Sequence, residues 1–430
     1  MTFALPIFLG NLLQLAYSLV DTRIVGSFLG EDALAAVGAT TTLSNLIVGF
    51  LLGLCNGFAI LTAQYFGAGD MDRVRKSLAE ALKMGLAVAV LLTVVGLVFL
   101  QPILRFLNVP EELLGIAGEY IFVIIAGLVA TLLYDVFSAT LRAMGDTLMP
   151  LLILAFSVVL NIGGDFLFVV VWGTGVRGAA IATVLSQVAS VIVCGIYMFE
   201  RYEMLRLSPE DFGQSEGQML RNMASSGFSM GFMTSLVNIG TLTLQTSINK
   251  LGQDIIIAHT AARKISEIFM IMFSVFGQTM ATYCGQNLGA GKTDRIRRGI
   301  WLAILYTCIW SVLTMIASYT IGARLVNLVT GSSNEIVVKN ATDYLKFDTL
   351  FYFVTAVICV VRNAMQGLGE RLVPLISSSL EMLGKIVIAA TLVPLLGYTG
   401  IILAEPIVWF LMVIPLLIKI FRMPVLKIKH

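Results

Sequence analysis

Apolar residues fill most of the chain in long runs, and short polar or Gly/Pro-rich segments separate one run from the next. Crossing the hydrocarbon core of a bilayer as an α-helix takes about 20 residues, and each run is long enough to do so. We therefore predict twelve membrane-spanning helices, at 3–25, 36–66, 80–104, 118–142, 148–172, 176–199, 224–250, 256–288, 298–320, 343–366, 372–396 and 398–421. The runs that end at Phe66 and Leu288 exceed a bilayer thickness, so these helices should tilt or protrude.

Composition supports this interpretation. Mean hydropathy is +0.91 and 13% of the residues are charged, against about 25% in soluble domains. The chain is therefore expected to be an all-α integral membrane protein whose main partner is the lipid bilayer. A net charge of +2 gives no basis for binding nucleic acid. The five cysteines are scattered through apolar runs without CxxC spacing, which indicates neither a disulfide framework nor a metal site. We expect no cofactor, no cleavable signal peptide and a monomer.

The distribution of Lys and Arg predicts the orientation in the membrane. Of the 28 basic residues, 18 fall in one set of loops and tails and 9 in the other, while Lys385 lies within a span. Loops rich in Lys and Arg stay in the cytoplasm. We therefore expect a multi-pass protein of the plasma or inner membrane with both termini in the cytoplasm.

The chain repeats itself once. Residues 63–75, AQYFGAGDMDRVR, recur at 285–297 as GQNLGAGKTDRIR, and LRAMGDTLMP at 141–150 recurs as MQGLGERLVP at 365–374. Each copy carries six spans, an even number that keeps both copies in the same orientation. This predicts two six-helix lobes related by a pseudo-two-fold axis along the membrane normal. The predicted parts are an N lobe at 1–199, a cytoplasmic linker at 200–223 and a C lobe at 224–430.

Polar residues within the apolar runs are the candidate functional groups. The run LLILAFSVVLNIGGDFLFVVVW at 151–172 contains Asn161 and Asp165, which are four apart and so on one helix face. A carboxylate at membrane depth costs roughly 2.5–3.5 kcal/mol on insertion scales, which favours a functional role in a watered cavity. In the first span, a polar stripe at helical spacing ends at Asp21 and comprises Asn11, Gln14, Tyr17, Ser18 and Asp21. Simpler roles stay open: Asp21 as a solvated residue at a helix end, and Asp165 as a structural hydrogen-bond partner.

Several motifs in order resemble one known family. The segments LPIFLGNLLQLAYSLVDTRIVG, QYFGAGD, QNLGAGK, RAMGDTLMP, NIGGDFLF and GVRGAAIATVLSQ are similar to those of multidrug and toxic compound extrusion transporters, in particular the DinF-type branch. The resemblance covers essentially the whole chain. It implies a secondary transporter and not an enzyme, with two bundles around a central cleft that opens alternately to each side. It also implies export of organic, often cationic, compounds by antiport with H⁺ or Na⁺.

The resemblance also implies roles for individual residues. The N-lobe cation site of the DinF-type branch falls on Asp21, Asn161, Asp165 and Thr183. A supporting polar network is expected at Gln14, Tyr17 and Ser138, and a helix bend at Pro6. Two neighbouring carboxylates raise each other's proton affinity, so such a site suits a proton. With amide and hydroxyl oxygens beside them the same residues also suit Na⁺. Without the family match, Thr183 would more often bond its own backbone.

The second copy departs from this pattern. At an offset of 224 residues, Asn161 corresponds to Lys385 and Asp165 to Ala389. Lys385 follows Glu381 by four residues, which predicts a neutral ion pair within one helix. We therefore expect one coupling site per chain, in the N lobe.

Four further acidic residues lie in or near spans: Asp135, Glu267, Asp348 and Glu405. Glu267 and Asp348 are kept as secondary C-lobe candidates for cation binding. Arg263 and Lys264 precede Glu267 on the same predicted helix, so structural pairing is the expected role of Glu267.

Other function classes fit less well. A lipid-linked oligosaccharide or cell-wall precursor flippase of the same superfamily would share the architecture, but its cleft should be cationic. An intramembrane aspartyl protease is suggested by Tyr134-Asp135 and by Gly163-Gly164-Asp165, yet Ile162 stands where its motif requires a first Gly. A passive channel should show a selectivity-filter sequence, and none is visible. The absence of GxxxxGK[ST] disfavours transport driven directly by ATP.

Overall fold

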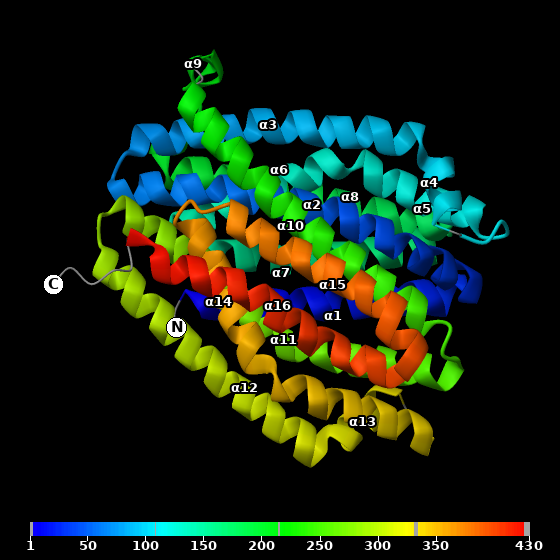
Figure 1. Cartoon of the computed structure of the whole chain (residues 1–430). Coiled ribbons are helices and arrows are strands. Elements are labelled where there is room, and N and C mark those ends of the chain that lie inside the picture. The colour runs from blue at the N-terminus through cyan, green and yellow to red at the C-terminus, as the bar shows by residue number, and fades with distance from the viewer. Residues whose placement is uncertain (1–2, 108, 214–215, 331–333, 425–430) are drawn as a thin grey trace. The chain divides into compact units, whose positions relative to one another are not determined.

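The computed structural model describes residues 3–107, 109–213, 216–330 and 334–424, and every regular element in these ranges is a helix (Figure 1). The elements are α1 Ala4–Leu29, α2 Glu31–Ala68, α3 Met71–Val98, α4 Leu100–Phe106, α5 Leu114–Ala126, α6 Leu128–Ala143, α7 Leu148–Asp165, the π-helical η1 Phe166–Val171, α8 Gly175–Arg201, the 3₁₀ turn η2 Glu203–Leu205, α9 Pro209–Gly213, α10 Gly217–Ile248, α11 Gln253–Gly289, α12 Thr293–Thr330, α13 Glu335–Leu350, α14 Tyr352–Gly367, α15 Leu372–Leu396 and α16 Tyr398–Arg422.

All twelve predicted spans correspond to helices. In the described residues, nine helices are long and apolar enough to cross a membrane, and eleven spans result when the bent pairs α5/α6 and α13/α14 each count as one. The remaining predicted span is α10, which has 32 residues and is long enough, but Ser, Thr, Asn and Gly interrupt its apolar run. The predicted all-α membrane fold is confirmed.

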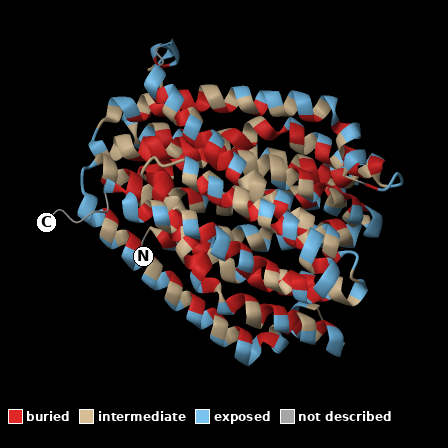
Figure 2. Ribbon diagram, viewed as in Figure 1, coloured by how far each residue is buried: buried red, intermediate tan, exposed pale blue. Residues whose placement is uncertain are grey.

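Lipid-facing surfaces are apolar, as expected for a membrane protein. On α12 the buried residues recur every three or four positions along one face, and Trp301, Leu305, Ile309, Val312 and Ile316 are exposed on the rest of the surface (Figure 2). A helix with an apolar exposed face is stable only where hydrocarbon replaces water around it. These side chains therefore mark the lipid contact of unit 2.

The chain forms two compact units, residues 1–231 and 232–430. The division falls inside α10 and not in the predicted linker at 200–223, because the first half of α10 packs on α2. Part of that predicted linker is helical: η2 and α9 lie within it, and α10 already begins at Gly217. The first six spans belong to unit 1, and unit 2 holds the last five spans together with the second half of α10.

The internal repeat of the sequence is reproduced in the turns. Gly69 and Gly291, which are 222 residues apart, have positive φ of 75° and 69° and end α2 and α11. In each turn the N–H after the glycine donates to the carbonyl five residues earlier, at 3.1 Å and 2.8 Å. This is the Schellman arrangement, in which only glycine takes the left-handed position without strain.

The two bent spans also correspond. The pair α5/α6 bends by 45° at Gly127 and the pair α13/α14 by 53° at Phe351, a separation of 351 − 127 = 224 residues. A Cβ atom at position 127 would lie 2.4 Å from a methyl carbon of Val184 on α8, so this bend requires glycine for close packing. The repeat therefore extends from sequence motifs to the positions at which helices break.

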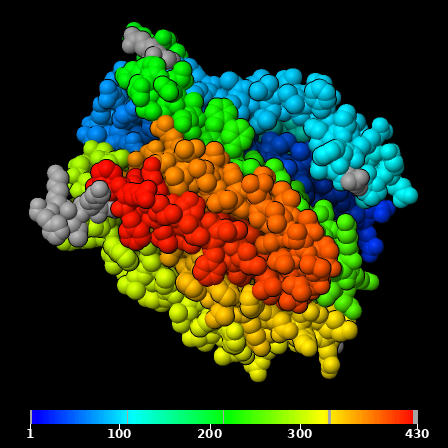
Figure 3. Space-filling view, viewed as in Figure 1, coloured from blue at the N-terminus to red at the C-terminus, as the bar shows by residue number. Residues whose placement is uncertain are grey.

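Close packing of glycine also joins helix pairs within each unit. In unit 2, α15 and α16 lie side by side (Figure 3), and a Cβ atom at Gly400 would lie 2.7 Å from the carbonyl oxygen of Leu392. In unit 1, α2 carries Gly53 and Gly57 and the first half of α10 carries Gly227 and Gly231. A Cβ atom at Gly57 would lie 2.4 Å from the Ser226 carbonyl oxygen. Both helices thus have the small-xxx-small spacing that lets backbones approach in a membrane.

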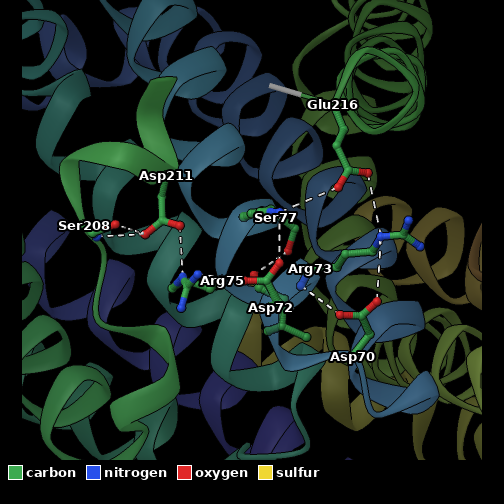
Figure 4. Close-up of polar contacts among 10 residues, drawn as sticks. Asp70, Asp72, Arg73, Arg75, Ser77, Ser208, Asp211 and Glu216 are labelled. Atoms are coloured by element: carbon green, nitrogen blue, oxygen red, sulfur yellow. Dashed lines mark hydrogen bonds and ion pairs between the residues drawn. The ribbon is translucent and has the colours of Figure 1, made fainter. Parts of the chain in front are cut away.

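The segment between α8 and α10 is held against the start of α3 by charged side chains (Figure 4). Arg75 Nε donates to Asp211 Oδ1 at 2.9 Å, and Glu216 lies 3.7 Å from Arg73 and 3.8 Å from Lys76. Burial alone would raise the pKa of the Asp211 carboxyl, but hydrogen bonds from the Ser208 backbone N–H and hydroxyl and from Arg75 outweigh it. The pKa of Asp211 therefore lies below its ordinary value.

We predict that Gly57→Ala destabilises the protein, because a backbone carbonyl must move to admit the methyl group. Overpacking of this kind costs about 1–3 kcal/mol, so the midpoint of thermal unfolding in detergent should fall. Gly38→Ala is the matched control on the same helix, because a Cβ atom there meets nothing within 4 Å. The control should be neutral or slightly stabilised, since Ala favours helix more than Gly. Equal effects at both positions would contradict the packing account.

We also predict an acid-labile contact at Asp211. A carboxyl whose pKa is lowered by folding contributes stability above its ordinary pKa of about 3.9 and loses this contribution as the pH falls toward the lowered value. The segment 203–216 should therefore be cleaved faster by an acid-active protease such as pepsin at pH 3 than at pH 5, relative to an unstructured peptide of the same sequence. Asp211→Asn should raise cleavage at pH 5 and reduce the difference between the two pH values.

Candidate functional site

Helix α7 carries the two polar residues that the sequence singled out, on one face and without exposure to solvent. Asn161 is 2% exposed and Asp165 is 0% exposed. Asp165 is the last residue of α7, and the chain continues directly into the wider π-helical turn η1. Turns of this kind are rare and occur frequently at functional sites. The change of helix type therefore coincides with the buried carboxylate.

Helix α1 supplies the second carboxylate. The carboxyl groups of Asp21 and Asp165 are within hydrogen-bonding distance of each other. Each of them has one oxygen, Oδ1, that is buried without a hydrogen-bond partner. Two carboxyl groups share a hydrogen bond only when one of them holds a proton, because ionised carboxylates are acceptors only. A pair of this kind can hold a proton between its oxygens.

Helix α8 completes the group through Thr183. In the amide orientation that satisfies its neighbours, Asn161 Nδ2 donates to Asp165 Oδ2 at 3.0 Å, and its Oδ1 lies 3.2 Å from Thr183 Oγ1. The Tyr17 hydroxyl on α1 lies 3.4 Å from the same Thr183 oxygen. Thr183 also donates to the Ala179 carbonyl at 3.1 Å, so its hydroxyl is bound to its own helix as well. The predicted residues of α1, α7 and α8 thus form one polar group.

A cavity of about 160 Å³ opens beside this group. Its wall includes Asn161, Thr183, Tyr17 and Gln14, together with apolar and polar residues of α2, α6, α7 and α8. Gln14, predicted to support the site, is therefore part of the cavity wall. At roughly 30 Å³ per molecule in the liquid, this volume corresponds to about five waters. The candidate site is a carboxyl pair, with Asp165 buried and Asp21 partly buried, next to a cavity large enough to hold water.

Two predicted supporting residues lie elsewhere in unit 1. Ser138 accepts a hydrogen bond of 2.5 Å from Arg142 Nη1 on its own helix, α6. Pro6 lies in the first turn of α1, which runs without a break from Ala4 to Leu29. The N–H groups of the first helical turn have no acceptor within the helix. Proline, which lacks an N–H, is therefore accommodated there without a kink. The chain is one continuous helix at Pro6, and the role of Pro6 as a bend stays a prediction.

The corresponding place in unit 2 holds four charged side chains. Lys385 Nζ lies 2.9 Å from Glu381 Oε1 and 3.2 Å from Glu405 Oε1, and Arg263 lies 3.5 Å from the same Glu405 oxygen. Lys385 also donates to the Thr241 hydroxyl on α10 at 3.4 Å. Two cations and two anions sum to zero. The predicted pair of Lys385 and Glu381 is present, but it is half of a larger neutral cluster.

The repeat relates this cluster to the site in unit 1. Lys385 corresponds to Asn161 at an offset of 224. Gly175 and Gly178 match Gly397 and Gly400 at an offset of 222, so Thr183 corresponds to Glu405. In unit 1 an amide faces a hydroxyl at these two positions, and in unit 2 an ammonium group faces a carboxylate. Unit 2 thus holds its own cation where unit 1 has a neutral amide.

The two secondary C-lobe candidates, Glu267 and Asp348, differ in burial. Glu267 is exposed on α11, and Arg263 pairs with Glu405 instead of Glu267. The structural pairing expected within α11 is replaced by a contact across 142 residues of sequence. Asp348 is 1% exposed and its Oδ1 is buried without a hydrogen-bond partner. Of the two, Asp348 is the buried acid near the charged cluster.

Sequence reasoning did not connect Asp135 with the N-lobe site. Asp135 and Tyr134 on α6 line the same cavity as Asn161 and Thr183. The available signal was helical spacing. Polar residues of α6 recur on one side of the helix at Thr131, Tyr134, Asp135, Ser138 and Arg142.

Comparisons with known proteins agree with this architecture. A MatE family model matches residues 6–167 and 229–391, one copy in each half. The chain is 24% identical over 370 residues to the probable multidrug resistance protein YpnP of Bacillus subtilis, covering 86% of this chain and 82% of that protein. It is 23% identical over 421 residues to a FAD transporter of Shewanella oneidensis, covering 96% and 91%. A crystal structure of MATE in the bent conformation has a TM-score of 0.90 at 22% identity, covering 98% of this chain and 94% of that one.

The fold and the family match define a multi-pass membrane transporter and not an enzyme. The chain belongs to the MatE family, the multidrug and toxic compound extrusion transporters. The predicted family is therefore confirmed.

We predict that Lys385→Ala destabilises the protein more than the double change Lys385→Ala, Glu381→Ala. The single change leaves Glu381 without a counterion and Glu405 with Arg263 alone, and breaking a buried pair costs about 3–5 kcal/mol. The double change removes one cation and one anion together and leaves the other pair balanced. Thermal unfolding in detergent measures both, and a double variant less stable than the single one would contradict the charge-balance account.

Proposed function

We propose that the protein exports organic cations by antiport with protons, and that Asp21 and Asp165 hold the coupling proton. The observation that carries this proposal is the buried carboxyl pair within hydrogen-bonding distance. A proton bound between the two carboxyl groups neutralises one negative charge and provides the hydrogen that the contact requires. Na⁺ is the competing ion, since carboxylate, amide and hydroxyl oxygens are also ligands for hard cations.

The substrate class follows from the lining of the cavity. Among the described residues of its wall there is an acid, Asp135, but no Lys or Arg. Tyr17 and Tyr134 add aromatic surface, which attracts organic cations. The cations of unit 2, Lys385 and Arg263, are balanced by carboxylates. A dianionic substrate such as the flavin nucleotide named for the Shewanella relative would meet no Lys or Arg among the described residues of the cavity wall, which favours cationic compounds.

Coupling in this proposal acts through α1. With the proton present, Asp21 and Asp165 are joined and α1 is held against α7. With the proton absent, two like charges repel at this contact, so α1 favours a different position. Two arrangements whose balance depends on the proton are what an alternating-access antiporter needs. The acidic N-lobe pair is the arrangement of the DinF-type branch, and we assign the chain to that branch.

We retain the orientation inferred from the basic residues. Of the 28 Lys and Arg residues, 18 lie in the loops and tails assigned to the cytoplasm, which supports cytoplasmic termini. The protein would then work as a monomer in the plasma or inner membrane, moving protons inward and drug outward.

The proposal is tested by transport of ethidium in proteoliposomes under an imposed pH gradient or an imposed Na⁺ gradient. We expect the pH gradient to drive transport and the Na⁺ gradient to be ineffective. Asp21→Asn and Asp165→Asn should each reduce transport to the level of protein-free vesicles, because an amide cannot bind the proton and is nearly the same size as the acid.

Asp343→Asn is the matched control, since this carboxylate is exposed in unit 2 and far in sequence from the pair. It should transport normally. Folding of all three variants is checked by size-exclusion chromatography and thermal unfolding. Transport driven by Na⁺ alone, or retained in Asp165→Asn, would overturn proton coupling at this pair.

A further inference from the structure

Asp135 is the acidic side chain among the described residues of the cavity wall in unit 1, and the proposed function does not use it as a proton carrier. Asp135 on α6 is 9% exposed, and its Oδ2 is buried without a hydrogen-bond partner. It lines the same cavity as Asn161, which in turn donates to Asp165. A buried carboxyl oxygen without a partner is unfavourable unless a proton, a cation or water satisfies it.

The nearest positive charge does not pair with Asp135. Among the described residues Asp135 makes no ion pair within 4 Å, whereas Arg142 donates to Ser138 at 2.5 Å and to Asn56 Oδ1 at 3.3 Å. Arg142 is nevertheless close enough for its positive charge to interact with the Asp135 carboxyl group. This charge stabilises the carboxylate when the proton leaves, without blocking its oxygens. Asp135 is thus placed to gain and lose a proton.

The other titratable groups around Asp135 do not hold a charge that would replace Arg142. They are Tyr134 on α6, Cys55 on α2 and Cys194 on α8, all neutral at ordinary pH. On α3, Glu80 is paired with Lys83 at 2.7 Å. On α7, the charged group is Asp165 itself, which is the other acid connected with the cavity.

Polar groups line the cavity that Asp135 shares with Asn161 and Thr183. Thr131 donates to Gln187 Oε1 at 2.7 Å on one part of the wall, and Tyr17 contacts Thr183 on another. Further hydroxyl groups of the wall belong to Ser157, Ser186 and Ser190. With room for about five waters, the cavity can hold a hydrogen-bonded chain along which a proton moves.

We propose that Asp135 is a proton-relay carboxylate, which loads and unloads the Asp21–Asp165 pair through the cavity that Asp135 shares with Asn161, the residue that contacts Asp165. A proton leaves the Asp135 carboxyl group, passes through cavity water and binds to the Asp165 carboxylate. The charge left on Asp135 is stabilised by Arg142, and a proton from the aqueous side restores it. The proton that leaves Asp135 is the one that Asp165 gains, so charge and atoms balance. This inference rests on the proposed proton coupling and assigns the path of the proton.

The relay is tested by measuring the rate of proton release separately from the number of protons released. Ethidium is mixed rapidly with the purified transporter in weakly buffered detergent, and a pH dye records the protons released. The wild-type protein should release protons on ethidium binding. Asp135→Asn should release the same number of protons at saturating ethidium, but at least tenfold more slowly. Asp135→Glu should restore most of the rate, because it retains a group that carries a proton.

Two further variants are compared with Asp135→Asn in the same experiment. Asp165→Asn should lose the amplitude of proton release, and if it does not, the proposed coupling pair is wrong whatever Asp135 does. Ser157→Ala, a neutral hydroxyl on the same cavity wall, is the control for a change of lining and should retain at least half of the rate. A wild-type rate in Asp135→Asn overturns the relay. Loss of amplitude in Asp135→Asn also overturns it, because Asp135 would then belong to the coupling pair.

Discussion

The pairing of the Asp21 and Asp165 carboxyl groups is the interaction on which the proposed coupling depends. Two neighbouring acids repel when both are ionised and attract when they share a proton, so in this proposal the position of α1 against α7 depends on one hydrogen. Asn161 donates to Asp165 and contacts Thr183, the π-helical turn begins directly after Asp165, and the cavity reaches Asn161 and Thr183.

The second half of the chain also buries charged groups, but it balances them with charges of its own. There, Lys385 stands at the position of Asn161 and Glu405 at that of Thr183, and Glu381 and Arg263 complete a set of four charges that sums to zero. These four charges balance one another, whereas the nearby Asp348 has a buried oxygen without a hydrogen-bond partner. Both halves keep the same helix breaks and the same glycine turns, so the difference between them lies in a few side chains within the repeat.

Much of the fold was predictable from sequence, because hydropathy and glycine spacing are local signals. The spans predicted at 372–396 and 398–421 correspond closely to α15 and α16. Contacts between distant segments were less predictable. The end of unit 1 was placed in the polar linker, but glycines of α2 draw the start of α10 into unit 1. Arg263 was expected to bind its neighbour Glu267, whereas the partly buried Arg263 pairs with the buried Glu405 of another helix, which would otherwise lack a second counterion.

The candidate site likewise combines features that local sequence patterns predict with contacts that they do not. The spacing of Asn161 and Asp165 indicated one helix face, and the family resemblance brought in Asp21 and Thr183. The place of Asp135 depends on how α6 packs against α7 and α8, which no local pattern encodes. The role of Pro6 also depends on context, because proline bends a helix only where an acceptor carbonyl is left without its partner.

Under the proposed coupling, the lysine in the second copy limits the drug gradient that the transporter can build. A single proton-exchanging pair per chain would let one proton enter for each drug molecule that leaves. Exchange of a proton for a monovalent organic cation moves no net charge, so the membrane potential contributes nothing to it. A pH difference of one unit is worth about 1.4 kcal/mol, a factor of ten in concentration. The drug gradient at steady state can then be no steeper than the proton gradient. A neutral substrate would also draw on the potential, about 2.3 kcal/mol for every 100 mV, and could be expelled further.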